Sequence, residues 1–361
     1  MSTFRLGHAV PHTLARPLVI AIALMLATPT FAADFTITGA ETNPQVLNGA
    51  STGVIETGGT LTVGAGLDAI TATGPDNTTT NSGTITAGDD GIDSRGDNAI
   101  ITNSGSITGT SFDGINSSGD DAIITNSGTI KAPIDDGIDS NGANAIITNS
   151  GTITGGDSGI ESGSTGINTT ITNSGSITGD ANGIHSIGAK AIITNSGSIT
   201  ATTYDGILSG GDDAIIKNSR TITATRDGIG SYSANATITN SGTITAGVVG
   251  IYSDAANATI TNSGTITSTS GDGIGSYSAN ATITNSGTIT GGNDGIDSGG
   301  ANATITNSGT ITAVDDGIDS IGANAIITNS GHITGTDHAI RGGSSDSLTL
   351  NLLKGSQLMG K

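Results

Sequence analysis

A unit of 22 to 24 residues recurs along most of this chain of 361 residues, and it constrains the fold more than any other feature. The unit contains Thr-Ile-Thr-Asn-Ser-Gly-Thr-Ile-Thr, as at residues 237–245, or a near copy of it. A repeat of this length is typical of elongated proteins in which each unit packs only on its neighbours. The twelve copies are marked by Asn81, Asn103, Asn126, Asn149, Asn173, Asn195, Asn218, Asn240, Asn262, Asn285, Asn307 and Asn329.

Each unit contains three short stretches in which apolar and polar residues alternate, such as residues 99–102, 106–108 and 114–116. Because successive side chains of a strand point to opposite faces, one face of this unit is apolar and the other polar. The apolar face would hold Ala99, Ile101, Ile107 and Ile115; the polar face would hold Thr102, Ser106, Thr108 and Asn116. One unit cannot offset its own ordering entropy, so the units must stack. The sequence therefore predicts an all-β parallel β-helix, or β-solenoid, of about 12 to 13 coils with three short strands per coil.

The segments outside the repeats predict the remaining organisation. Residues 1–32 have the features of a signal peptide, with basic residues, the apolar run 18–27 and small residues before a cleavage site after Ala32. We therefore expect a secreted chain. Residues 33–58 are predicted to be an irregular N-terminal cap, residues 59–343 the β-helix repeats, and residues 344–361 a C-terminal cap or a truncated further coil.

The recurring asparagine predicts a structural ladder. Its side-chain amide can bond the asparagine of the next coil, and its backbone can adopt the left-handed conformation at a corner. The ladder would include Asn103, Asn126, Asn149, Asn195, Asn240, Asn262, Asn285, Asn307 and Asn329. A glycine two residues later permits the corner, and Arg220 replaces it in one copy, so we expect the weakest corner there.

Charge and repeat length argue against nucleic-acid binding and against enzyme activity. A formal net charge of −20 excludes nucleic-acid binding, which needs a basic face. Units of 22 to 24 residues leave no insertion that could wall off a catalytic cleft, and His185, His332 and His338 are widely separated in the sequence. We therefore expect no enzyme activity, no catalytic residues and no cofactor. Ser158 lies in a Gly-Asp-Ser-Gly motif like that of chymotrypsin-like proteases, but the histidines upstream of it lie in the signal peptide.

The run of residues 136–151, Asp-Gly-Ile-Asp-Ser-Asn-Gly-Ala-Asn-Ala-Ile-Ile-Thr-Asn-Ser-Gly, resembles the repeats of autotransporter passenger domains from Gram-negative bacteria. The tail at residues 343–350 is similar to the segment that often closes such arrays. The resemblance implies a right-handed parallel β-helix at the cell surface, used for adhesion, biofilm formation or as a stalk. It also implies an outer-membrane translocator barrel, which we expect to lie in a missing part of the protein or in a separate partner. The expected partners are a host or cell surface, or a polysaccharide.

Two sets of residues are candidate ligand contacts. The outward position of the third strand varies most between units, and the four tyrosines of the chain, Tyr204, Tyr232, Tyr252 and Tyr277, lie in or near that part of the repeat. Arg95, Gly96 and Asp97 spell the tripeptide of integrin ligands, although a template that reads Ser-Gly-Asp in the next unit explains it as a turn.

Two further functions remain as alternatives. The outward Ser/Thr-x-Thr pairs of the second strand resemble the flat arrays of ice-binding proteins, while threonine is also simply favoured in strands. An aspartate precedes Gly-Ile in many units, and calcium could bridge such a column into a stiffened surface stalk. Local preference for Asp-Gly turns explains the same column without metal. The aspartates are Asp90, Asp113, Asp136, Asp205, Asp227, Asp272, Asp294 and Asp316.

Overall fold

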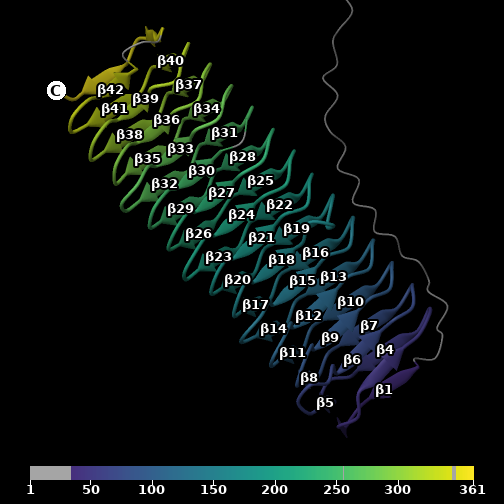
Figure 1. The fold of residues 1–361 in the computed structure, drawn as a ribbon. Helices are drawn as coiled ribbons and strands as arrows, with labels where there is room; N and C mark the ends of the chain where they lie inside the picture. Colours follow the sequence, from purple (N-terminus) through teal and green to yellow (C-terminus); the bar gives the residue numbers. More distant parts are fainter. Residues whose placement is uncertain (1–33, 255, 344–346) are drawn as a thin grey trace, which may run out of the picture. The chain divides into compact units, whose positions relative to one another are not determined.

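The computed structural model describes residues 34–254, 256–343 and 347–361. The chain divides into two compact units, Met1–Ala32 and Ala33–Lys361. The first, with the predicted signal peptide, lies outside the described residues. In the second unit all of the described elements, β1 to β44, are strands, and they form three parallel sheets (Figure 1). None of the described residues forms a helix long and apolar enough to cross a membrane.

Sheet A contains the first strand of each coil and has fifteen strands. They are β1 (Phe35–Ile37), β4 (Thr52–Ile55), β7 (Thr78–Asn81), β10 (Ile100–Asn103), β13 (Ile123–Asn126), β16 (Ile146–Asn149), β19 (Thr170–Asn173), β22 (Ile192–Asn195), β25 (Ile215–Asn218), β28 (Thr237–Asn240), β31 (Thr259–Asn262), β34 (Thr282–Asn285), β37 (Thr304–Asn307), β40 (Ile326–Asn329) and β43 (Thr349–Leu352).

Sheet B contains the second strand of each coil and also has fifteen strands. They are β2 (Ala40–Glu41), β5 (Thr60–Thr62), β8 (Thr84–Ala87), β11 (Ser106–Gly109), β14 (Thr129–Ala132), β17 (Thr152–Gly155), β20 (Ser176–Gly179), β23 (Ser198–Ala201), β26 (Thr221–Ala224), β29 (Thr243–Ala246), β32 (Thr265–Ser268), β35 (Thr288–Gly291), β38 (Thr310–Ala313), β41 (His332–Gly335) and β44 (Gln357–Met359).

Sheet C contains the third strand of each coil and has fourteen strands. They are β3 (Gln45–Leu47), β6 (Ile70–Ala72), β9 (Ile92–Ser94), β12 (Ile115–Ser117), β15 (Ile138–Ser140), β18 (Ile160–Ser162), β21 (Ile184–Ser186), β24 (Ile207–Ser209), β27 (Ile229–Ser231), β30 (Ile251–Ser253), β33 (Ile274–Ser276), β36 (Ile296–Ser298), β39 (Ile318–Ser320) and β42 (Ile340–Gly342).

The coils stack with equivalent residues in register, and this places the apolar side of every strand inside. β10 pairs with β13 so that Ile101 faces Ile124 and Asn103 faces Asn126. Within one coil Ile101, Ile107 and Ile115 are buried, as predicted, and isoleucines of equivalent positions form one continuous core cluster. The structure therefore confirms the predicted parallel β-solenoid with three short strands per coil.

The N-terminal segment differs from the prediction. Residues 33–58 were expected to be irregular, but strands β1 to β4 occupy much of this segment and pair in parallel with β4, β5, β6 and β7. Ile37, Leu47 and Ile55 continue the core cluster, so the segment adds coils although it lacks the Asn-Ser-Gly motif. The stack has about fifteen coils for this reason, counting one strand of sheet A per coil.

The C-terminal segment also continues the stack. β43 pairs with β40, and β44 pairs with β41, so this end of the solenoid adds strands of sheets A and B to the last repeat. Several apolar side chains of these strands and of the turn between them are exposed: Leu350, Leu352, Leu353, Leu358 and Met359. Residues 344–346, where the predicted C-terminal segment begins, lie outside the described residues.

Candidate functional site

The predicted asparagine ladder is present and lies inside the corner between sheets A and B. The Nδ2 of each asparagine from Asn81 to Asn307 donates to the Oδ1 of its equivalent in the next coil, always at 2.8 Å. These side chains are almost completely buried. A buried amide with satisfied hydrogen bonds holds one fixed register between coils, so the role of the ladder is structural.

The backbone reason given for the ladder was wrong. The left-handed residues belong to another column, five residues before the buried asparagines, with φ between 58° and 63°. Asparagine and aspartate dominate it, because their short polar side chains tolerate this conformation. Many of its side chains form a second, exposed ladder, as in Asn280 Nδ2 to Asn257 Oδ1 at 3.0 Å. The column contains Asp76, Asn98, Asp121, Asn144, Asn168, Lys190, Asp213, Asn235, Asn257, Asn280, Asn302 and Asn324.

The glycine two residues after eleven of the twelve buried asparagines allows a close approach between coils and does not adopt a positive φ. A Cβ on Gly105 would lie 2.0 Å from the carbonyl oxygen of Gly83 in the coil below. Arg220 stands at this position in its own coil, and the bond from Thr221 N to Gly197 O is 3.3 Å long there. The equivalent bond of the preceding coil, from Ser198 N, is 2.9 Å long. On the other side of Arg220, however, the bond from Thr243 N to Arg220 O is 2.7 Å long, so a weak corner at Arg220 stays a prediction.

The aspartates before Gly-Ile form a column beside sheet C, and their role is not local. The Oδ1 atom of each of these aspartates, and of Asp68 in the coil before Asp90, accepts a hydrogen bond from the backbone N–H at the equivalent position of the next coil. The N···O distances are 2.6 to 3.2 Å. Asn182 accepts the same bond in its coil. The side chains join neighbouring coils, which corrects the interpretation of the column as a purely local turn preference. Ser158 of the protease-like motif is buried in this column, where its N–H donates to Asp136.

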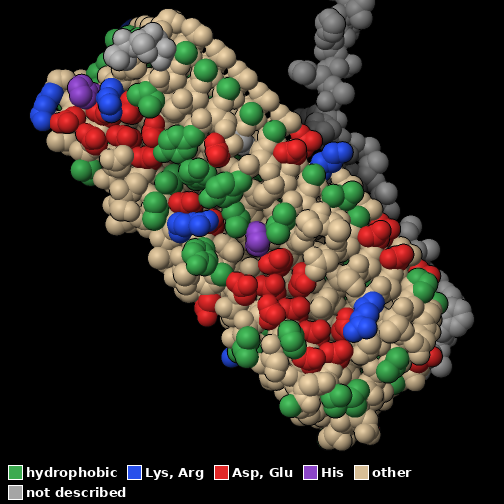
Figure 2. Space-filling view, viewed as in Figure 1, with side chains coloured by type: hydrophobic (Ala, Val, Ile, Leu, Met, Phe, Trp, Pro, Cys, Tyr) green, Lys and Arg blue, Asp and Glu red, His purple; other side chains and the backbone are tan. Residues whose placement is uncertain are grey.

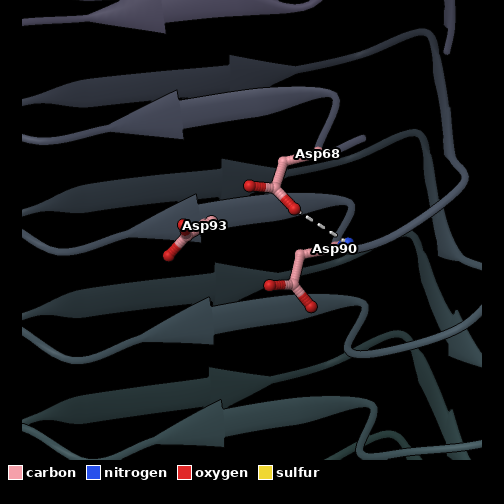
Figure 3. Close-up of side chains that lie close together, drawn as sticks. All are labelled: Asp68, Asp90 and Asp93. Carbon is pink, nitrogen blue, oxygen red and sulfur yellow. Dashed lines mark hydrogen bonds between the residues drawn. The ribbon is translucent and has the colours of Figure 1, made fainter. Parts of the chain in front are cut away.

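Carboxylates gather in three groups along this column, with oxygens that lie within 4.8 Å of one another. Figure 3 shows the first, Asp68, Asp90 and Asp93, in which Asp68 Oδ1 accepts the Asp90 N–H at 3.2 Å. Such oxygens are the ligands that calcium prefers. Hydrogen bonds to backbone N–H groups account for one oxygen of Asp68 and one of Asp90, and Arg95 pairs with Asp93. Calcium binding here stays a prediction. The other two groups are Asp113 with Asp135 and Asp136, and Asp294 with Asp315 and Asp316.

Two aspartates of the group around Asp113 have strongly raised pKa values. Burial, and then the neighbouring carboxylates beginning with Asp139, raise the pKa of Asp113 to about 9. Burial also raises the pKa of Asp136 to about 8, although the Ser158 N–H opposes the shift. Asp139 has a pKa of about 6 because of burial and the nearby Glu161. Like charges this close favour the neutral form or attract a cation.

Three of the four tyrosines come together on the outer face of sheet C. The ring centroids of Tyr232 and Tyr252 are 5.1 Å apart, and those of Tyr252 and Tyr277 are 5.6 Å apart. Tyr204 lies apart from this stack and packs against Arg226, with the guanidinium carbon 5.3 Å from the ring centroid. The Tyr277 hydroxyl donates to Asp272 Oδ2 at 2.9 Å. Of the predicted ligand face, three tyrosines therefore form an ordered aromatic row, which we call the tyrosine row (Tyr232, Tyr252 and Tyr277).

The Arg-Gly-Asp tripeptide follows β9 and is a fixed part of the stack. Arg95 and Asp97 are exposed, but Gly96 is buried. Arg95 forms an ion pair with Asp93, and Asp97 Oδ1 accepts the Asp120 N–H at 3.0 Å. Both charged groups therefore already have partners within the chain, which favours the structural interpretation as a turn.

The outer face of sheet B is chemically different from sheet C. From β8 to β41 its outward positions hold serine or threonine, except Lys131 and His332. The hydroxyl residues lie in register, as in Thr243 with Thr265 and Thr245 with Thr267. Figure 2 shows, by contrast, acidic side chains in patches along the face turned to the viewer, with hydrophobic and basic side chains between them.

Comparisons of this chain with protein-family models, with curated proteins and with solved structures found no match.

Proposed function

We propose that this chain is a secreted scaffold at the surface of a Gram-negative cell, an autotransporter-like passenger that attaches to other surfaces or to polysaccharide. The observation that supports it is the in-register stacking, which repeats every outward column of residues once per coil. A ligand with its own repeat can contact such a face at many equivalent points, each weak, and gain affinity from their number. The resemblance of residues 136–151 to passenger repeats supports the location.

Surface display tests this proposal. The full chain is joined to an outer-membrane translocator in a Gram-negative host, and an epitope at the solenoid is labelled on intact cells. We expect labelling and increased attachment to surfaces or to biofilm polysaccharide, compared with cells that carry the translocator alone. Removal of residues 1–32 is the matched control and is expected to abolish labelling. A chain that reaches the surface without increasing attachment would contradict the adhesive role.

Ice binding is the second candidate, and the hydroxyl array of sheet B favours it. The array is regular over many coils and carries few charges. The measurement is the shape of ice crystals grown in the presence of the purified chain. If ice binds, the double variant Thr245→Lys and Thr267→Lys should lose the effect, while Thr239→Lys on sheet A should keep it. Thr239 is a suitable control because Lys217 stands in register with it. Unshaped crystals with the wild-type chain would remove this candidate.

A further inference from the structure

We propose that the tyrosine row binds a linear polysaccharide that carries protonated amino groups, laid along the stacking direction of the coils. The proposal rests on the surface-scaffold function and names its ligand class. Three observations support it: the arrangement of the rings, the charge around them, and an arginine side chain that packs between a carboxylate and a tyrosine on the same face.

The three rings form a row, with neighbouring planes tilted by 37° and 42°, and glycines make room for two of them. Tyr252 stands at the outward position of β30, whereas Tyr232 and Tyr277 follow β27 and β33 and fold back over them. A Cβ on Gly230 would lie 3.2 Å from Tyr232 Cε2, and a Cβ on Gly275 would lie 3.1 Å from Tyr277 Cε2. All three rings therefore occupy the same outward column, in three successive coils.

The row suits a sugar polymer in spacing and in chemistry. The centroid separations of 5.1 and 5.6 Å are close to the length of one hexopyranose unit in an extended chain. The C–H face of a sugar ring packs on an aromatic ring, whose electron-rich face also attracts cations. Tyr232 and Tyr277 are 43% and 38% exposed, which leaves ring surface for a ligand.

The surrounding charge selects among polysaccharides. Asp205 and Asp227 lie close to Tyr232, the first tyrosine of the row, and Asp272 and Asp297 lie close to Tyr277, the last. Asp294, in the coil after Tyr277, adds a carboxyl group close to Asp272 and Asp297, and Figure 2 shows acidic side chains in patches on the face turned to the viewer. This field repels uronate or sulfated chains and attracts ammonium groups.

Basic side chains neutralise this field only in part: Arg341 pairs with Asp316 and Asp319, whereas Asp272 and Asp297 beside Tyr277 form no ion pair within the described residues. Residues 200–320 contain three basic side chains, and Lys217 and Arg220 lie on sheet A and at the corner between sheets A and B. The third is Arg226, whose side chain contacts both a carboxylate and a tyrosine ring of this face. Its Nε donates to Asp205 Oδ1 at 2.7 Å, and its guanidinium lies over the Tyr204 ring. A carboxylate combined with an aromatic ring is thus an arrangement that binds a cation in this chain. Asp272 beside Tyr277 repeats that combination without an arginine.

Direct binding to the purified chain tests the inference, with a glucosamine hexamer as the probe at about pH 6.5. At this pH amino groups are largely protonated, and carboxyls with a pKa of about 6, such as Asp227 and Asp297, are largely ionised. We expect binding of the hexamer that the triple variant Tyr232→Ala, Tyr252→Ala and Tyr277→Ala weakens about tenfold or more. The triple Tyr→Phe variant should retain most of the binding, because the rings remain. Ile192→Ala is the matched control, since it removes an exposed apolar side chain from sheet A, and it should change nothing.

The comparison probes are the neutral N-acetylglucosamine hexamer, an oligouronate and hexalysine. We expect weaker binding of the first, none of the second, and hexalysine binding that the triple alanine variant weakens less than it weakens binding of the glucosamine hexamer. Equal affinity of the wild type and the triple alanine variant for the glucosamine hexamer would overturn the inference. So would hexalysine binding as tight as that of the sugar with the same dependence on the rings. Neither outcome depends on surface display, so a failure of this inference can be distinguished from a failure of the proposed function.

Discussion

Side-chain amides and carboxylates join neighbouring coils at three positions of the repeat, and the positions differ in burial. The buried asparagines donate to one another at the corner between sheets A and B. The left-handed column carries exposed bonds of the same kind, in which aspartate replaces asparagine in some coils. The aspartates beside sheet C accept backbone N–H groups while largely excluded from water. One substitution should therefore have different effects in the three columns.

Replacement of asparagine by aspartate separates the two amide ladders. Asn240→Asp removes the donor to Asn262 and places a charge in a buried position, so we expect a loss of about 2 to 4 kcal/mol. Asn257→Asp is the control and should cost less than about 1 kcal/mol, because Asp213 occupies that exposed column naturally. Urea unfolding followed by circular dichroism measures both. Equal losses would show that burial of the first ladder does not decide its contribution.

Neutralisation of Asp113 should stabilise the chain in a pH-dependent way. Its pKa is raised from 3.8 to about 9, so ionisation destabilises the folded state progressively as the pH rises between these values. Asp113→Asn can still accept the Asp136 N–H, as Asn182 accepts the Asp205 N–H. We expect a gain of about 1 to 3 kcal/mol near pH 8. Near pH 4 we expect almost none. A gain that is the same at both values would contradict the explanation by burial and by the neighbouring carboxylates.

At the scale of the strand, alternation decides which side chains stabilise the sheets. In β29, Ile244 is completely buried between Ile222 and Ile266, whereas Thr245 is exposed. The strands are short, so each contributes little alone, and their stability comes from pairing with the equivalent strands of both neighbouring coils.

Aspartate substitutions in β29 test this alternation. Ile244→Asp should cost several kcal/mol, because it places a carboxylate in an aliphatic stack. Thr245→Asp, which faces water, should cost less than about 1 kcal/mol. Thermal unfolding of the two variants and the wild type compares them, and similar midpoints for the two variants would mean that the strand faces water on both sides.

The strands and their pairing could largely be predicted from the sequence, because every coil repeats the same pattern of residues. The isoleucine columns and the partners of Asn103 follow from alternation and identical stacking. The N-terminal coils could not be predicted from the motif, since Ile37 and Leu47 continue the core without it. The positions of the Tyr232 and Tyr277 rings depend on glycines two residues earlier, Gly230 and Gly275, a spacing that becomes informative only once the path of the turn is known. The inter-coil role of Asp113 depends on that path in the same way.

At the scale of the whole solenoid, the ends differ from the middle. The last strands, β42 to β44, each pair with an earlier coil and have an unpaired edge within the described residues. Exposed leucines accompany these edges, and such a surface is a template for strands of another chain.

We expect the chain to self-associate through residues 344–361 as its concentration rises. Sedimentation over a range of concentrations measures this. Deletion of these residues should not prevent association, because it exposes the coil that begins near His332, whereas an appended coil with a polar outer side should give a monomer. A monomer at every concentration would show that the exposed leucines do not direct association.

Removal of one complete coil should leave the fold intact. Deletion of residues 241–262 joins Asn240 to Ser263, and every residue downstream finds a partner equivalent to the one it lost. We expect an unchanged β spectrum and a small change in the unfolding midpoint. Deletion of residues 241–251, half a coil, is the control and should disrupt the stack, because isoleucines and turns would then face one another.

In-register stacking also has a consequence for the gene. Near-identical DNA repeats recombine with one another, and unequal exchange adds or removes whole copies. In most proteins such an event destroys the product, but here each added copy brings the asparagine, the isoleucines and the carboxylate that its neighbours require. Repeat number can therefore change between generations while the coil stays the same. The length of the solenoid is then a heritable property that selection can adjust one coil at a time.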